Sequence, residues 1–339
     1  MEKNAQNSIW NKARQFLFNI WYMNESGIII PTIIFGFLVY LVNPVFLSKI
    51  NVTNILRSTG FTLISAIGMT LVLISGGIDL SVGSVLGLGG MFVGIFMVNL
   101  GIPIWLSILL TLLIGLFVGF LNGFTIIKFK IPPMIMTLGM MYMARGIVYT
   151  RTKGLPIYPM PDAFQAIEQV NLFGVPKIVF ICLILSAIFH VILTSTAFGR
   201  SIYAVGGNIS TAKLSGINTE RVILLVYMIN GMMASLTGIM MASRLGSAQP
   251  SSGTGNEMNV IAACIIGGTS TFGGRGTILG TAIGALFMSM LSNSMTLLRV
   301  DVYYQNLAIG AVLVFAVILD QYKRTMAESG ARNKSHSKA

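Results

Sequence analysis

Two acidic side chains, Asp79 and Glu257, lie close to the ends of long apolar stretches in a chain with only 9% charged residues. A charge at such a position is costly in a membrane and is usually functional or paired. Asp79, in the run GGIDLS, has a second interpretation, because its carboxylate can cap a helix that begins near Ser81. We favour the cap for Asp79. Asn122 and Thr137 offer neutral hydrogen bonds, which suit a polar solute or a neighbouring helix equally well.

Other residues that support catalysis or metal binding are scarce. The sequence has two histidines, His190 and His336, and two cysteines, Cys182 and Cys264, none of them at a metal-ligand spacing. Both cysteines fall inside apolar stretches, where a thiol usually fills space. The sequence therefore predicts neither an enzyme nor a bound metal or cofactor.

One glycine-rich stretch, 268–275 (GTSTFGGR), looks like the first half of a phosphate-binding loop. A working loop continues with Lys and then Ser or Thr, which reach the β- and γ-phosphates and the magnesium ion. Gly274 and Arg275 occupy those two positions, so the chain is not expected to hydrolyse ATP. Any ATP that drives this protein must be bound by another subunit.

The elements that carry these residues are long apolar segments. Hydrophobic residues make up 54% of the chain, and runs of about 20 residues, enough to cross a ~30 Å hydrocarbon layer, recur along it. The sequence therefore predicts an all-α polytopic membrane protein with about ten transmembrane helices. The eighth run is too short for an ordinary span and is expected to be broken or re-entrant. The predicted runs are 28–46, 55–75, 82–98, 104–127, 132–150, 177–195, 220–242, 257–268, 276–297 and 303–320.

The distribution of basic residues predicts the orientation. With the N- and C-termini in the cytoplasm, more of the 22 lysine and arginine residues lie on the inner side than on the outer side, as the positive-inside rule expects. The net charge of +12 thus reflects topology and attraction to anionic lipid, not nucleic-acid binding. The predicted parts are a cytoplasmic or interfacial segment, 1–27, which is an amphipathic helix or a frayed tail, a transmembrane domain, 28–320, and a basic cytoplasmic tail, 321–339.

Glycines recur at intervals of four residues in three of these runs. Such spacing places small residues on one helix stripe, so that neighbouring backbones approach closely. We expect close packing inside one chain rather than a seam between two copies. The glycines are Gly83 and Gly87, then Gly115, Gly119 and Gly123, then Gly276, Gly280 and Gly284.

A loop of low charge, 196–219, lies between two apolar runs and is cytoplasmic in this topology. Its stretch NISTAKLSG predicts a short helix that Asn208 caps and Gly216 ends. Gly206 and Gly207 permit a sharp change of direction before it. Such a helix is too short to be stable alone. It therefore suits docking on another protein or, equally, an ordered connection between two spans.

Five sequence blocks between about residue 50 and residue 320 carry a family resemblance. The blocks are LVLISGGIDLSVGS (71–84), IPPMIMTLGMMYMARG (131–146), TAFGRSIYAVGGNISTAKLSGIN (196–218), NEMNVIAACIIGGTSTFGGRGTILGTAIGA (256–285) and VDVYYQNLAIGAVLVFAVILD (300–320). In these blocks the chain resembles the inner-membrane permease subunits of bacterial ABC importers for monosaccharides, of the ribose, xylose, arabinose and galactose type. The resemblance implies a type II ABC importer-like permease in the bacterial inner membrane.

That resemblance also implies partners and a mechanism of alternating access. The partners are ABC ATPase subunits that bind ATP, a periplasmic sugar-binding protein, and a second permease copy or paralogue across a central path. The third block is implied to be the coupling segment that fits a groove of the ATPase, with Ala212 near the contact. The implied coupling residues are Arg200, Gly206, Gly207, Asn208, Ala212, Lys213, Gly216 and Asn218, and the candidates for the translocation path are Asp79, Asn122, Thr137 and Glu257.

One departure from the family pattern and several alternatives stay open. The family usually has Glu-Leu-Asp in the fourth block, whereas this chain has Glu257, Met258 and Asn259. Related permeases transport branched-chain amino acids or furanose-like signalling molecules. A self-contained secondary carrier is disfavoured because carriers usually need more buried ionisable residues. A membrane enzyme lacks a catalytic cluster.

The longest outer segment, 151–176, is stiffened by Pro156, Pro159 and Pro161 and contains the stretch DAFQAIEQV. The stretch predicts a short surface helix, with Asp162 and Glu168 as exposed positions. We expect this segment either to help dock the binding protein or simply to cover the outer mouth.

Overall fold

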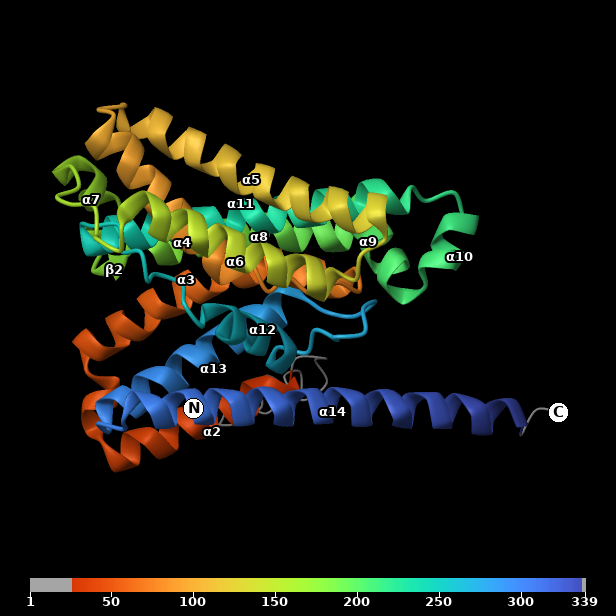
Figure 1. Cartoon of the computed structure of the whole chain (residues 1–339). Helices are drawn as coiled ribbons and strands as arrows, with labels where there is room; N and C mark the ends of the chain where they lie inside the picture. Colours follow the sequence, from red (N-terminus) through yellow and green to blue (C-terminus); the bar gives the residue numbers. More distant parts are fainter. Residues whose placement is uncertain (1–25, 337–339) are drawn as a thin grey trace, which may run out of the picture.

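The protein is an elongated bundle of helices in the computed structural model, which describes residues 26–336 (Figure 1). One end of the bundle carries α7, and the opposite end carries α9 and α10 (Figure 1); we call them the α7 end and the α10 end. The elements are α2 (Ser26–Val42), η1 (Pro44–Leu47), α3 (Lys49–Ile74), α4 (Val82–Gly94), η2 (Ile95–Asn99), α5 (Ile104–Phe129), α6 (Pro133–Thr152), α7 (Asp162–Gln169), β1 (Asn171–Leu172), β2 (Val175–Pro176), α8 (Lys177–Ser195), α9 (Ala197–Gly207), α10 (Ile209–Leu214), α11 (Thr219–Leu245), α12 (Asn256–Ile266), α13 (Ile278–Leu297) and α14 (Val302–His336).

Every predicted apolar run coincides with a helix. Within the described residues, six of these helices are long and apolar enough to cross a membrane, namely α3, α4 with η2, α5, α8, α11 and α13. The apolar helices α2 and α12 and the first part of α14 are shorter. The mostly helical architecture, with helices that can span a membrane, is therefore confirmed, although β1 and β2 form a small two-stranded sheet. The count of ten crossings and the cytoplasmic position of both termini stay predictions.

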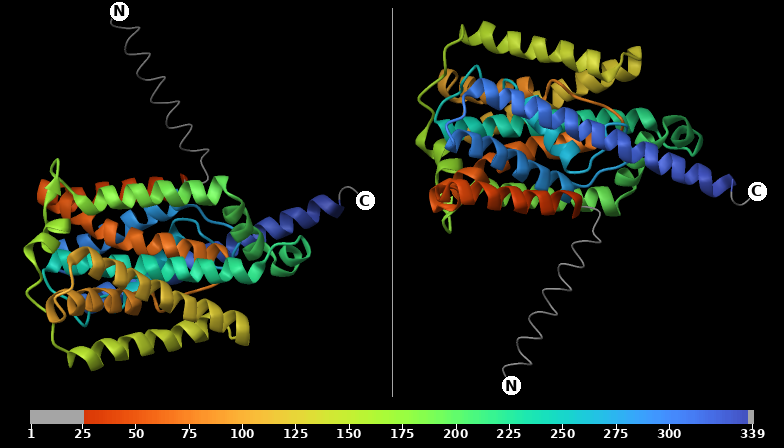
Figure 2. Two further views of the ribbon diagram at one scale, coloured as in Figure 1. Left: turned by 90° about the horizontal axis from the view of Figure 1, so that it is seen from above. Right: turned by 90° about the horizontal axis from the view of Figure 1, so that it is seen from below.

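The structure describes little of the predicted N-terminal segment and most of the predicted C-terminal tail. Most of the N-terminal segment, 1–25, lies outside the described residues. The predicted tail begins inside α14, whose backbone continues as one helix to His336. This helix extends beyond the bundle at the same end as α10 (Figure 2).

Helix α11 occupies the centre of the bundle, against α3, α4 and α5. Its contact with α5 depends on small residues: a Cβ atom on Gly119 would clash with the backbone of Tyr227, and one on Gly231 would clash with that of Gly115. Gly280 and Gly284 of α13 meet α12 in the same way, at Gly267 and Ala263. The stripe on α5, and Gly280 and Gly284 of the stripe on α13, thus pack helices together within one chain, whereas Gly276 lies before α13 begins.

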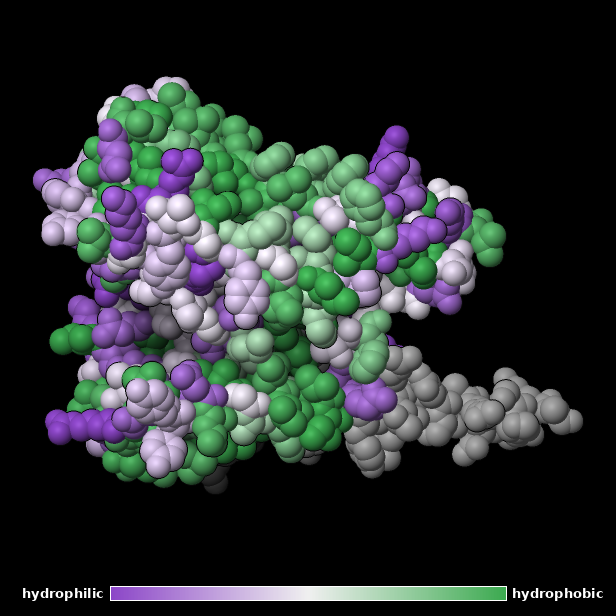
Figure 3. Space-filling view, viewed as in Figure 1, coloured by the Kyte–Doolittle hydropathy of each residue, from purple (hydrophilic) through white to green (hydrophobic). Residues whose placement is uncertain are grey.

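The outer surface of the bundle is largely apolar. Large hydrophobic side chains with about half or more of their surface exposed recur on α2, α5 and α8, among them Leu41, Phe117 and Leu183. Figure 3 shows this surface over α5, with hydrophilic residues gathered at the α7 end and around α10. A belt of this kind suits a lipid environment, whereas its polar ends suit water.

Candidate functional site

A buried polar cluster forms where the chain turns between α3 and α4. The Asp79 carboxylate accepts hydrogen bonds from the Ser81 backbone N–H at 2.8 Å and from the Ser81 hydroxyl at 2.6 Å. It also accepts one from the Asn230 amide of α11 at 2.8 Å. Asp79 is only 2% exposed. The carboxylate therefore joins Ser81, the residue before α4, to α11, whereas α4 itself has no side-chain cap hydrogen bond, so the cap interpretation is not confirmed.

Asn122 and Thr137 belong to the same cluster. The Asn122 amide donates to the Ser81 hydroxyl at 3.1 Å. The Thr137 hydroxyl accepts from the Leu80 backbone N–H at 3.1 Å and donates to a carbonyl one turn earlier in α6. Both side chains are fully buried. Three of the four path candidates thus lie together, and this geometry favours helix joining over contact with a solute.

Glu257 lies elsewhere, in the first turn of α12, and it is partly exposed. Its carboxylate packs directly against Gly83 of α4, where a Cβ atom would have no room. Arg145 of α6 lies close by. Its guanidinium donates to the carbonyls of Pro250 at 3.0 Å and Ser252 at 2.8 Å, and reaches that of Gly83 at 3.5 Å. Sequence reasoning gave Arg145 no role at this site.

Helix α12 is a half-length helix, as the eighth run predicted. The chain leaves α11 at the α7 end, where Ala248 and Ile157 exchange backbone hydrogen bonds of 3.0 Å. It then runs without helix down the bundle until α12 begins, away from both ends (Figure 1). This non-helical stretch, 249–255, holds the sequence QPSSGTG. We call it the polar segment.

The predicted loop 196–219 folds into two short helices, α9 and α10, at the α10 end. The Asn208 side chain accepts from the Thr211 N–H at 2.9 Å and so caps α10, as predicted. Gly216 has a φ of +82°, which ends the helix where glycine was expected to end it. Asn218 caps α11 by accepting from the Arg221 N–H at 3.0 Å.

Gly206 has a different role from the one its sequence context suggested. It is part of α9, and a Cβ atom there would overlap the carbonyl of Ile74 at the end of α3. The Gly274 N–H donates to that same carbonyl at 2.8 Å. Gly206 therefore provides close backbone contact rather than a bend, while Gly207 beside it faces open space.

The stretch that looks like a phosphate loop is a structural junction. The Tyr203 hydroxyl of α9 donates to the Gly276 carbonyl at 2.7 Å. The Asp320 carboxylate of α14 accepts from the Thr271 backbone N–H at 3.1 Å and from the hydroxyl groups of Ser270 and Thr271 at 3.2 Å. These bonds tie α9 and α14 to the link between α12 and α13.

The exposed part of α10 was not foreseen. Ala212, expected near an ATPase contact, is 3% exposed and packs inside the chain, whereas Leu214 is 90% exposed and Ile209 is 51% exposed. Lys213 and Arg200 are also exposed. Ala212 lies on the inner side of α10, which packs on α9. Its place near an ATPase contact stays a prediction, and this burial does not favour direct contact. The signal that could have found Leu214 is an apolar residue next to the terminating glycine of a short solvent-exposed helix.

A cleft of about 520 Å³ opens between α10 and the link from α5 to α6. Lys130, Lys213 and Glu220 line it with charged groups, and Tyr227 lines it with an aromatic ring. Ile209 and Lys213 of α10 form one wall of this cleft, whereas Leu214 does not line it.

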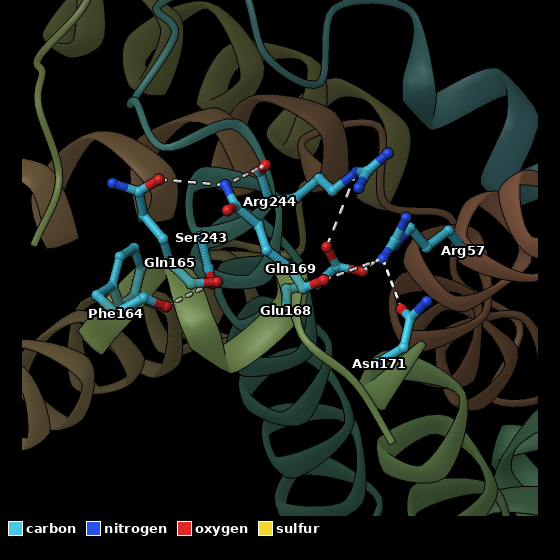
Figure 4. A network of polar contacts seen from close by, with 8 residues as sticks. All are labelled: Arg57, Phe164, Gln165, Glu168, Gln169, Asn171, Ser243 and Arg244. Atoms are coloured by element: carbon cyan, nitrogen blue, oxygen red, sulfur yellow. Dashed lines mark hydrogen bonds and ion pairs between the residues drawn. The ribbon is translucent and has the colours of Figure 1, made fainter. Parts of the chain in front are cut away.

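The outer segment packs onto the bundle through a buried charge network (Figure 4). Glu168 of α7 accepts from the Arg57 Nε of α3 at 2.8 Å, and its other oxygen lies 3.8 Å from the Arg244 Nε of α11. The surface helix is confirmed, but Glu168 is fully buried, so its predicted exposure is wrong. Burial raises the pKa of the Glu168 carboxyl, although the two guanidinium groups act to lower it. Asp162 is exposed as expected.

Known proteins match this chain over most of its length. The family model described as "Branched-chain amino acid transport system / permease component" matches residues 51–317. The ribose import permease protein RbsC of Haemophilus influenzae is 41% identical over 308 residues, which cover 90% of this chain and 95% of the relative. RbsC of Bacillus subtilis is 41% identical, covering 89% and 94%.

A further relative is named for xylose. The xylose transport system permease protein XylH of Escherichia coli (strain K12) is 35% identical, covering 81% of this chain and 86% of the relative. No solved structure matches the chain. Its relatives are transport permeases rather than enzymes, and with its apolar helices they indicate an integral membrane protein. The chain therefore belongs to this ABC permease family, and it is similar to the family's sugar importers.

Proposed function

We propose that this chain is the membrane permease subunit of an ATP-binding-cassette importer in the bacterial cytoplasmic membrane, and that it moves a monosaccharide inward. The α10 end faces the cytoplasm and the α7 end faces the periplasm. Relatives named for ribose and xylose support a pentose or hexose as the solute.

The exposed apolar surface of α10 carries this proposal. Leu214 is 90% exposed and Ile209 is 51% exposed, and both lie on one short helix at a bundle end where polar residues gather. A contiguous exposed apolar patch often marks a protein interface. Ile209 and Lys213 lie on the same helix, and a cleft opens beside them. This surface suits a separate ATPase subunit, whose closure on ATP would push α9 and α10 against the bundle.

The junction below α10 explains how such a push reaches the spans. Gly206 of α9 touches the end of α3 without an intervening side chain, and Tyr203 holds the link between α12 and α13. A displacement of α9 therefore acts directly on backbone, which deforms less than a flexible side chain. The predicted coupling residues on α9 and α10 thus divide into contacts with the ATPase and contacts with the bundle.

The outer segment is proposed to meet a periplasmic sugar-binding protein. Its hairpin exposes Phe173 almost completely, at 92%, and Asp162 is also exposed. The buried Glu168 network holds this surface in place on α3 and α11. A second permease copy or paralogue completes the central path.

Co-purification with the cognate ATPase tests the proposal. Leu214→Asp places a charge where an apolar contact is expected, so ATPase binding should fall by about tenfold or more. Phe173→Asp makes the same change at a similarly exposed aromatic residue on the opposite end, and it should leave ATPase binding unchanged. Full ATPase binding and sugar uptake by Leu214→Asp would show that α10 is only a connection. Ala212→Asp is a poor probe, because it would disturb packing inside the chain.

A further inference from the structure

The polar segment, 249–255, is chain without helix at membrane depth. Gly253 lies directly against the backbone of Gly83, one turn above the buried Asp79 cluster. That cluster bonds Asn230, which is roughly 17 Å from the start of α11, a helix roughly 40 Å long. The polar segment therefore reaches about the middle of the hydrocarbon layer.

This segment is not covered by the rest of the chain. Ser251, Thr254 and Gly255 are exposed, and the neighbouring Asn256 and Glu257 are partly exposed. In Figure 3, paler and more hydrophilic residues interrupt the apolar surface in the middle of the face that carries α12. The structure thus presents hydroxyl, amide and carboxylate groups on an outer face at a depth where lipid tails would lie.

Lipid cannot cover such a surface. Irregular backbone at membrane depth is tolerated only inside protein or on the wall of a water-filled cavity. A partly exposed carboxylate is costly for the same reason. Some groups of the polar segment bond within the chain, as the Thr254 hydroxyl does to the Ser251 carbonyl at 2.8 Å. Lipid would offer no partner to the exposed Ser251 hydroxyl, so this face suits water or polar protein.

Arg145 stabilises the non-helical backbone of the polar segment. Its guanidinium satisfies the carbonyls of Pro250 and Ser252, which a helix would otherwise have bonded. Tyr142, one turn earlier on α6, is 71% exposed and extends the same face. The result is an irregular wall that exposes the polar side chains of Ser251 and Thr254.

We infer that the polar segment 249–255, together with Glu257 and Tyr142, lines the sugar path between this chain and a second permease, with Arg145 as the positioning residue. This inference rests on the proposed function. A sugar must exchange its water for other hydrogen bonds as it crosses the membrane, and the polar segment supplies them at mid-depth. The buried Asp79 cluster does not.

Thiol accessibility tests the inference in the assembled importer, reconstituted in liposomes with its ATPase and binding protein. Thr254→Cys and Ser251→Cys are compared with Ile188→Cys, an exposed apolar position at a similar depth on α8. The unmodified chain gives the baseline, because its two native cysteines are buried. A water-soluble methanethiosulfonate reagent is the probe, since thiolates react only where water reaches them.

We expect Thr254→Cys to react at least about tenfold faster than Ile188→Cys. D-ribose or D-xylose, whichever the unmodified importer carries, should slow that reaction. Equal rates at Thr254→Cys, Ser251→Cys and Ile188→Cys, with and without ATP, would overturn the inference. So would fast labelling that the transported sugar does not slow. If the unmodified importer carries neither sugar, the proposed function fails, whereas the difference in accessibility still decides whether this face lines a water-filled path.

Discussion

Two polar regions lie at similar depth in the bundle, and they differ in burial. Around Asp79 the donors and acceptors come from the turn before α4 and from α5, α6 and α11. Asp79, Asn122, Thr137 and Asn230 are at most 2% exposed. Along the polar segment, Ser251 and Thr254 are exposed and the chain is not helical. The first region joins helices to one another, whereas the second offers its groups to something outside the chain.

The comparison shows that a polar residue inside an apolar sequence does not by itself mark a path. Asp79 and Glu257 are both acids near the ends of apolar runs, and their sequence contexts look alike. What separates them is whether the surrounding helices close over the carboxylate. The glycines decide this in part: Gly231 and Gly119 let α11 and α5 approach closely, while the QPSSGTG stretch keeps its surroundings open.

The largest effect is expected at Asp79. Asp79→Ala removes the acceptor for the Ser81 N–H, the Ser81 hydroxyl and the Asn230 amide, so it should lower the free energy of unfolding by about 3 kcal/mol or more. The melting temperature of the purified permease in nanodiscs measures this loss. Asp79→Asn keeps the shape of the side chain, so its melting temperature should lie between those of Asp79→Ala and the native chain. An unchanged melting temperature for Asp79→Ala would remove the distinction between the two regions.

Glu257→Gln should show the opposite behaviour. The side chain is partly exposed, so the melting temperature should stay close to that of the native chain. Loss of a charged acceptor in the path should raise the KM of sugar uptake by about tenfold. Uptake kinetics in liposomes measure this change, and a large fall in stability with unchanged KM would place Glu257 with the buried cluster.

Thr137→Val is expected to have a smaller effect on the stability of the buried region. The substitution keeps the shape of the side chain but leaves the Leu80 N–H without its acceptor, which should cost about 1 kcal/mol of stability. The KM for sugar should not change in the fraction that remains folded. A selective rise in KM would instead return Thr137 to the list of path residues.

Thr254→Ala should have the smallest effect. An exposed position outside the core usually changes stability by less than about 0.5 kcal/mol, and one neutral hydrogen bond to a sugar changes affinity by roughly threefold. Matched measurements of melting temperature and KM on Thr254→Ala and Thr137→Val would sharpen the comparison, because each variant should move only one of the two quantities.

Local signals in the sequence predicted much of the fold. Apolar runs of sufficient length predicted the helices, and the short eighth run predicted the half-length α12. Asn208 and Gly216 bound α10 as expected, since capping and termination depend on neighbouring residues alone. The glycine spacing on α5 and α13 predicted close packing for the same reason.

Positions that depend on tertiary packing were not predictable. The side of α10 that faces outward depends on how the loop folds back, so Ala212 was chosen where Leu214 is exposed. Glu168 looked like a surface residue because Arg57 and Arg244, which bury it, are far away in sequence. The open face beside Arg145 likewise depends on three elements that meet only in the folded chain.

Reconstitution in liposomes tests the central claim most directly. The account predicts ATP-dependent accumulation of a pentose or hexose, tested with D-ribose and D-xylose, only when the permease, the cognate ATPase and the binding protein are all present. The permease alone should neither hydrolyse ATP nor accumulate sugar, because its loop 268–275 lacks the lysine and hydroxyl of a nucleotide site. ATP turnover or sugar accumulation by this chain without any partner would contradict the account.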